Sequence, residues 1–208
     1  MLPKKLFRGS KSYQPCPLSK CPNIISVNEF SDKELLEKFL DPDTRSYAFN
    51  LLVRKYQEPV YLHIRRMVID HDDTNDIVQN VFIKVWKNLE TFREDSKLYT
   101  WIYRIATNES ITFLKRKRNK YFLPLEDVAN YMSSVIDSGN YYNGDEIQTK
   151  LQKAILNLPT KQRLIFNMKY FEELKYEEIS EILGTSIGAL KASYHHAVKK
   201  IEKQLKEN

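Results

Sequence analysis

Apolar residues recur along the chain with the 3.6-residue period of an α-helix, in two separate stretches. In the first stretch, helices are predicted at about 31–40, 44–56, 59–68, 73–89 and 98–117. Helical periods resume at Ile147 and continue to the C-terminus, with breaks at Pro159, near Glu172 and at Gly184. No segment shows the convincing period of two that is typical of a β-strand, so we expect an all-α protein.

The ends of the first helices follow from local chemistry. Ser31 and Glu34 have the spacing of a capping box, in which each side chain bonds the other residue's backbone N–H. Pro42 is expected to end that helix, and Pro59 is expected to begin the third helix, because proline favours a first turn. Asp73 is expected to begin the fourth helix.

The charge of +6 is distributed unevenly. Residues 1–28 carry five basic and no acidic residues, whereas residues 123–147 carry five acidic and no basic ones. Residues 29–122 and 148–208 are mildly basic and carry the helical patterns. We therefore predict two small helical domains joined by a flexible acidic linker and preceded by a flexible basic tail.

Composition excludes several classes of protein. No stretch approaches the ~20 apolar residues of a membrane span, and none of the five glycines forms a phosphate-binding loop. Cys16 and Cys21 lack further ligands at zinc spacing, so free thiols are expected. The basic tail lacks the apolar core of a secretory signal, so a cytoplasmic protein is expected. We see no catalytic or metal-binding constellation and expect no cofactor.

The segment 176–200 has the spacing of a helix-turn-helix. Ser180 is small where a second helix would cross, Gly184 suits the turn, and Leu190 would anchor the second helix. An ordinary helical hairpin has the same core pattern, so the outward face must decide. That face is cationic and free of carboxylates, and it consists of Lys191, Ala192, His195, His196 and Lys199. These residues suit a helix in the major groove of DNA.

Two features of the first domain suggest more than packing. The fourth helix has a polar face of Asp72, Asp73, Asp76, Gln79 and Asn80, which either caps the helix or docks a partner. Residues 92–120 interleave aromatic and basic side chains, as single-stranded nucleic acid requires. About half of these aromatics are expected to be structural, and the loop 93–97 is the expected place for a base pocket.

These segments together closely resemble the extracytoplasmic-function (ECF) sigma factors, the minimal bacterial sigma factors. Residues 73–86 (DTNDIVQNVFIKVW) look like the polymerase-docking segment of sigma region 2, and residues 92–108 (FREDSKLYTWIYRIATN) look like its promoter-melting segment. Residues 158–163 and 176–201 look like sigma region 4, with its helix-turn-helix. The resemblance implies a region 2 helical bundle at 29–122 and region 4 at 148–208.

The resemblance also implies partners and roles. Core RNA polymerase would bind region 2 through its largest-subunit clamp helices and region 4 through its flap, with promoter DNA as the second partner. A membrane-bound anti-sigma factor is common in the family, and no stable homo-oligomer is expected. The residues implied to face the polymerase are Asp76, Gln79, Asn80 and Ile83. Those implied to contact the minus-ten element are Phe92, Ser96, Tyr99, Trp101, Arg104, Asn108, Lys115, Arg116, Lys117 and Arg118. Those implied to read the minus-thirty-five element are Lys191, Ala192, His195, His196 and Lys199.

The resemblance is incomplete, and rival functions remain. The family usually carries arginines where Ser193, His196 and Val198 stand, and the long N-terminal tail is not a family feature. One rival is a dimeric helix-turn-helix regulator that binds operator DNA without polymerase. Another rival is a small enzyme that binds a metal through the carboxylates of residues 72–76. The sequence lacks the paired Glu-x-x-His ligands that are typical of such sites in helical bundles.

Overall fold

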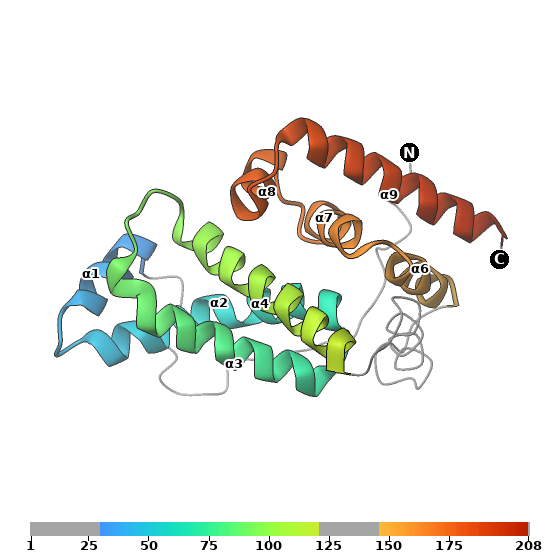
Figure 1. The fold of residues 1–208 in the computed structure, drawn as a ribbon. Helices are drawn as coiled ribbons and strands as arrows, with labels where there is room; N and C mark the ends of the chain where they lie inside the picture. The colour runs from blue at the N-terminus through green and yellow to red at the C-terminus, as the bar shows by residue number, and fades with distance from the viewer. Residues whose placement is uncertain (1–29, 121–145, 208) are drawn as a thin grey trace.

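The computed structural model describes residues 30–120 and 146–207, which form helices joined by short turns and loops and include no strand. The first group of helices contains α1 (Asp32–Leu40), α2 (Arg45–Val68), α3 (His71–Asn88), the short 3₁₀ helix η3 (Leu89–Thr91) and α4 (Leu98–Lys120). The second group contains α6 (Glu146–Leu156), α7 (Thr160–Tyr170), α8 (Tyr176–Leu183) and α9 (Ile187–Glu207), as Figure 1 shows. The all-α prediction is confirmed. The basic tail lies outside the described residues, as does the acidic linker except for its last two residues, Glu146 and Ile147, which begin α6.

Helix α1 begins as the sequence predicted. The backbone N–H of Ser31 donates to the Glu34 carboxylate at 2.7 Å, and the backbone N–H of Glu34 donates to Ser31 Oγ at 3.3 Å. This capping box satisfies two backbone donors that a helix start leaves without partners. The hydrogen bonds of Ser31 hold the pKa of the exposed Glu34 carboxyl below its usual range.

Helix α2 is continuous through Pro59, so the prediction of two helices at 44–56 and 59–68 was wrong. Proline inside a helix removes one backbone hydrogen bond and costs about 3 kcal/mol. Tyr56, Val60 and Ile64, on either side of Pro59, lie on one face and are buried in the same core. Burying side chains of this size contributes about 1.5–3 kcal/mol each, which offsets the cost of the proline.

The turn between α2 and α3 is tighter than the sequence indicated. Ile69 adopts a φ of 69°, an unfavourable conformation for a β-branched residue, and its side chain is fully buried. Asp70 then caps α3, since its carboxylate accepts a hydrogen bond from the backbone N–H of Asp73 at 2.9 Å. The helix therefore begins at His71 and not at Asp73 as predicted.

The helix-turn-helix forms where it was predicted, between α8 and α9. Gly184 ends α8 with φ 60° and ψ 33°, and its backbone N–H donates to the carbonyl oxygen of Ser180 at 2.8 Å. Leu190 is buried beside Ile179 and Ile182 of the first helix of the motif. Another cluster, around Phe166, Ala197 and Ile201, joins α6, α7 and α9.

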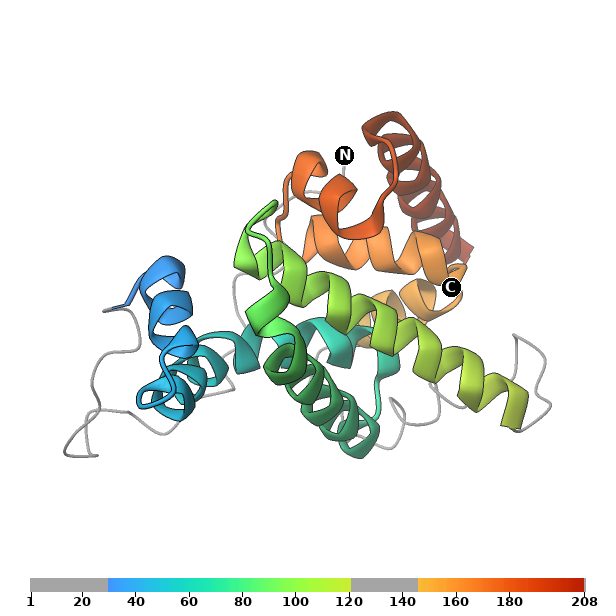
Figure 2. The same cartoon turned by 60° about the vertical axis from the view of Figure 1, so that its left-hand side comes forward.

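The two groups of helices share one apolar core. Helix α8 packs on α4 and helix α7 packs on α2, an arrangement that is clear in Figure 2. Buried residues of the second group such as Ile165, Ile179 and Ile182 belong to the same cluster as Ile64 and Ile102 of the first. The sequence predicted two tethered domains but not this contact between them. Within the described residues, no helix has the length and apolar character to cross a membrane.

Candidate nucleic-acid and polymerase interface

The four residues predicted to face the polymerase lie together on the exposed side of α3. They occur at positions i, i+3, i+4 and i+7, so they share one face of the helix. The opposite face, with Ile77, Val81 and Val85, is buried against α2 and α4. Ile83 has half of its surface exposed among the polar side chains of Asp76, Gln79 and Asn80. A mixed apolar and polar patch of this kind is suited to a protein partner.

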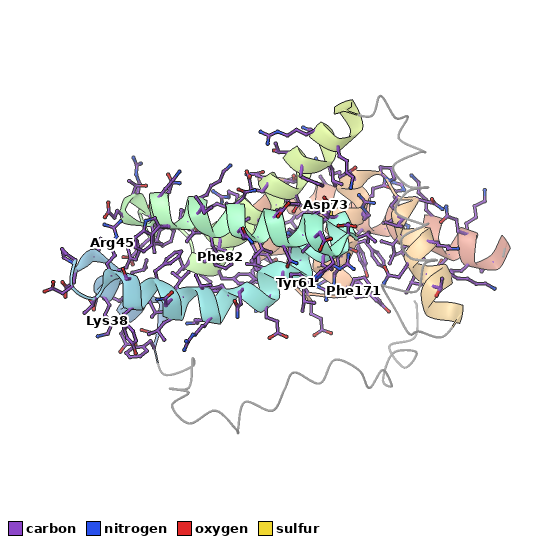
Figure 3. All side chains as sticks on the ribbon, turned by 90° about the horizontal axis from the view of Figure 1, so that it is seen from below. Lys38, Arg45, Tyr61, Asp73, Phe82 and Phe171 are labelled. Carbon is purple, nitrogen blue, oxygen red and sulfur yellow. The ribbon has the colours of Figure 1, made fainter. Side chains whose placement is uncertain are left out.

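The acidic start of α3 has a structural role as well. The Lys117 ammonium of α4 bonds the Asp73 carboxylate at 2.5 Å, which ties the start of α3 to the C-terminal half of α4. Figure 3 shows Asp73 and Tyr61 toward the end of the bundle where Phe171 also lies, with Lys38 and Arg45 at the opposite end. In residues 30–120 and 146–207 no group of three or more His, Cys, Asp or Glu is arranged to hold a metal ion.

The loop 93–97 precedes α4, and the aromatic residues on either side of it in the sequence form a pair. The rings of Phe92 and Trp101 lie 5.2 Å apart, and both side chains pack partly buried against the core. Glu94 adopts a φ of 57°, which turns the chain back toward α4. Ser96 is half-buried and Arg93 is exposed. Phe92 and Trp101 therefore contribute to the packing of the core on either side of the loop.

The other residues of α4 that were predicted to contact DNA differ in their exposure to solvent. Asn108, Lys115 and Arg116 are exposed, whereas the side chain of Arg118 lies outside the described residues. Tyr99 is half-buried, with its ring 4.1 Å from that of Tyr103. Burial raises the pKa of the Tyr99 hydroxyl, the interaction with Tyr103 raises it further, and the carboxylates of Glu172 and Glu178 add the smallest contributions. Tyr99 thus packs, partly buried, against the apolar core that the two groups of helices share.

All five residues predicted to read the minus-thirty-five element are exposed on one face of α9. Ala197 and Ile201, on the opposite face, are buried, which fixes the orientation of the helix. The rings of His195 and His196 lie 6.2 Å apart, and the Lys191 ammonium lies 5.7 Å from the centre of the Tyr176 ring. The face is cationic and points away from the core, as DNA recognition requires.

Comparison with known proteins identifies the family. Residues 52–120 match the model of sigma-70 region 2, and residues 148–201 match that of sigma-70 region 4. The chain is 33% identical over 168 residues to the ECF RNA polymerase sigma factor SigW of Bacillus subtilis, covering 77% of this chain and 90% of that protein. This chain belongs to the ECF sigma factors. It is also 31% identical over 187 residues to the ECF RNA polymerase sigma-E factor of Haemophilus influenzae, covering 86% of this chain and 97% of that protein.

Two solved structures have a similar fold. The sigma factor RpoE, in complex with the anti-sigma factor NepR from Bartonella quintana, has a TM-score of 0.58 at 20% identity and covers 76% of this chain and 96% of its own. CnrH, in complex with the cytosolic domain of CnrY, has a TM-score of 0.61 at 20% identity and covers 85% of this chain and 98% of its own. The match to sigma region 2 runs from within α2 to the end of α4, and the match to sigma region 4 runs from α6 into α9.

One polar cluster of this sigma factor was missed by sequence reasoning. His63 of α2 is buried, and its Nδ1 lies 3.1 Å from the Glu172 carboxylate in the turn after α7. Its Nε2 lies 3.0 Å from Thr107 Oγ1 of α4, and Arg66 Nη1 donates to the same carboxylate at 3.5 Å. The sequence marked Glu172 only as a helix break, because its partners are about a hundred positions away. Nothing local in the sequence pairs these residues.

Proposed function

We propose that this chain directs core RNA polymerase to a specific set of promoters and promotes opening of their DNA. The observation that carries the proposal is the exposure of two separate faces, the α3 face and the α9 face, within the matched sigma regions. We place region 2 at 29–122 and region 4 at 148–208, with the acidic linker 123–147 threading the basic RNA-exit path of the polymerase. The cytoplasm is the compartment in which this function operates.

The α3 face is proposed to bind the clamp helices of the largest polymerase subunit. Asp76, Gln79 and Asn80 supply directional polar contacts, and Ile83 supplies exposed apolar area. Region 4 is proposed to contact the flap of the polymerase. Docking makes the contacts of both regions with DNA intramolecular, which raises their effective concentration.

Promoter melting is proposed to occur at the loop 93–97 and the adjoining face of α4. Asn108 and the aromatic residues around the loop would hold an extruded base, and Arg104, Lys115 and Arg116 would hold phosphates. Each stacked base contributes about 1–3 kcal/mol, comparable with the few kcal/mol that unstacking costs. Trapping bases in this way requires no catalytic group on the chain.

The α9 face is proposed to read the minus-thirty-five element in the major groove. Lys191 and Lys199 suit phosphates, and the shorter Ala192 near the start of the helix allows close approach to bases. The family's arginines are replaced by Ser193, His196 and Val198, so few phosphates are neutralised. The affinity should therefore depend only weakly on salt.

A protein inhibitor is a further proposed partner. One of the similar solved structures is the sigma factor RpoE in complex with the anti-sigma factor NepR, and the other is CnrH in complex with the cytosolic domain of CnrY. We propose that an anti-sigma factor of this kind, anchored at the membrane, restrains this chain. The chain is expected to be monomeric without it.

The test of the function is run-off transcription from genomic fragments with core RNA polymerase. We expect specific transcripts only when the purified chain is added, and we expect the chain to co-purify with core enzyme. Equal transcription with and without the chain would reject the proposal. Tight binding of the chain alone to two half-sites about one helical turn apart would instead favour the dimeric regulator.

A further inference from the structure

We infer that the free chain inhibits itself, because region 4 is latched over the face of region 2 that binds the minus-ten DNA. The latch is defined here as Glu172 together with its partners His63 and Arg66. The inference rests on the proposed function for the identity of the covered face. The latch itself is a contact between the two regions and does not depend on DNA.

The latch places one carboxylate of region 4 among groups of region 2. The side chains of Glu172 and His63 are 6% and 1% exposed, respectively. An ionised carboxylate only accepts hydrogen bonds, so His63 Nδ1 donates to Glu172. The other ring nitrogen, Nε2, is within hydrogen-bond distance of Thr107 Oγ1. The Arg66 guanidinium also stacks near the Phe171 ring at 5.2 Å, which holds the residue before Glu172 in place.

A second set of contacts reinforces the latch next to α7. Asn167 Nδ2 of α7 donates to the carbonyl oxygen of Arg66 at 3.3 Å. The end of α2 therefore contacts region 4 through side chains and through its own backbone. Burial raises the pKa of the Glu172 carboxyl, but the charges and hydrogen bonds of His63 and Arg66 outweigh burial and lower it below the usual range.

Latching brings α8 onto the nucleic-acid face of α4. Arg104 Nη2 donates to the carbonyl oxygen of Glu181 at 2.6 Å, and the Lys97 ammonium lies 3.8 Å from the Glu178 carboxylate. Both region 2 cations thus meet oxygen atoms of α8, and a phosphate bound at the proposed DNA face would need the same cations. Tyr99 is half-buried against the apolar core that α4 shares with α8. DNA and α8 therefore compete for one surface.

The latch has the properties of a reversible contact. A buried ion pair gains attraction but loses hydration, so its net contribution is small, while removal of one partner is strongly unfavourable. A polymerase that binds the two regions at separate sites would select the open arrangement. The same chain can therefore be closed when free and open when bound to the enzyme.

The first experiment measures closure without DNA. A carbodiimide joins an amine directly to a nearby carboxylate, and Lys97 and Glu178 are close enough to be linked. We expect mass spectrometry to find the linked Lys97–Glu178 peptide in the free wild-type chain. Glu172→Lys should lower the yield of this linked peptide several-fold. Glu173→Lys is the matched control, because it makes the same change of charge at the neighbouring exposed position, and it should leave the yield unchanged.

The second experiment measures masking in the same full-length variants. Binding of a short, fluorescent, mixed-sequence single-stranded DNA is followed by anisotropy without polymerase. We expect Glu172→Lys to bind this DNA about tenfold more tightly than Glu173→Lys. A tenfold difference corresponds to about a tenth of the control molecules being open, because only the open fraction binds DNA. Circular dichroism checks folding, and Glu172→Gln, which keeps the side-chain size, replaces the lysine variant if that variant unfolds.

Each outcome has a separate meaning. Absence of the Lys97–Glu178 link in the wild-type chain overturns the closed arrangement, even if the chain supports transcription. Equal yields in Glu172→Lys and Glu173→Lys overturn the role of Glu172. Loss of the link in Glu172→Lys without tighter DNA binding overturns the masking, and it then faults the proposed DNA face and not the contact between the regions.

Discussion

Gly184 holds the helix-turn-helix together through its backbone conformation. Its φ of 60° lies in the left-handed region, where other residues carry a steric cost. A Cβ built at Gly184 would meet no atom within 4 Å, so space around the residue is not the constraint. The glycine is required for its dihedral angles alone, and this makes its contribution measurable.

Gly184→Ala is expected to lower the free energy of unfolding by about 1–2 kcal/mol, since alanine is strained at positive φ. Gly188→Ala is the matched control, because Gly188 lies in α9 without positive φ and its added Cβ would also meet open space. That control should instead stabilise the protein by about 0.5–1 kcal/mol. Chemical denaturation checks both values, and equal effects would contradict the conformational argument.

Asn108 provides a test of the melting face at the level of one side chain. It is exposed on α4, so Asn108→Ala should fold normally. We expect open-complex formation to fall about tenfold, equivalent to ~1.4 kcal/mol, with a smaller effect on initial promoter binding. Permanganate footprinting of melted bases checks this, with Asn50→Ala on α2 as the control for an exposed helical asparagine. Unchanged footprints would remove Asn108 from the proposed pocket.

Helices whose two faces differ were the most predictable elements. The exposed faces of α3 and α9 followed directly from the period of the apolar residues, because one stripe of each helix must be buried. The break at Gly184 was equally visible. The predicted break at Pro59 was wrong, since core residues on both sides keep α2 continuous, and no local rule weighs proline against burial that depends on distant helices.

The α3 face can be tested as a unit. Asp76→Arg combined with Gln79→Ala should weaken association with core polymerase by about a hundredfold or more, because a repulsive charge replaces a central contact. Asp43→Arg with Gln57→Ala makes the same changes at exposed positions elsewhere and should have no effect. Co-purification with core enzyme is the measurement, and retained association of the first pair would reject this docking face.

The packing of the two regions against each other is the property that could not be predicted from the sequence. Lys117 and Arg104 were both expected to contact phosphates. In the structure, Lys117 bonds the Asp73 carboxylate, and Arg104 donates to the carbonyl oxygen of Glu181, 77 positions away. Such pairs depend on how whole helices pack, and one sequence contains no record of which distant residues meet. The whole molecule therefore decides which predicted cations are available to DNA.

Core polymerase should change this availability. If both regions dock at separate sites on the enzyme, adding core enzyme should reduce the Lys97–Glu178 cross-link of the wild-type chain several-fold. The Lys84–Glu109 pair, 2.5 Å apart within region 2, should cross-link equally with and without polymerase and serves as an internal control. A Lys97–Glu178 yield that polymerase leaves unchanged would mean that docking does not separate the regions.

The hydrogen bond from Arg104 ends on a main-chain oxygen of residue 181 and not on its side chain. Every amino acid retains that oxygen, so a substitution at position 181 leaves the acceptor in place. An alanine scan of α8 would therefore overlook this contact. Natural variation at that position would also leave the contact intact, as long as the helix persists. This hydrogen bond of Arg104 is therefore lost only when α8 moves away from α4 or unwinds. The availability of one guanidinium thus depends on the position of a whole helix.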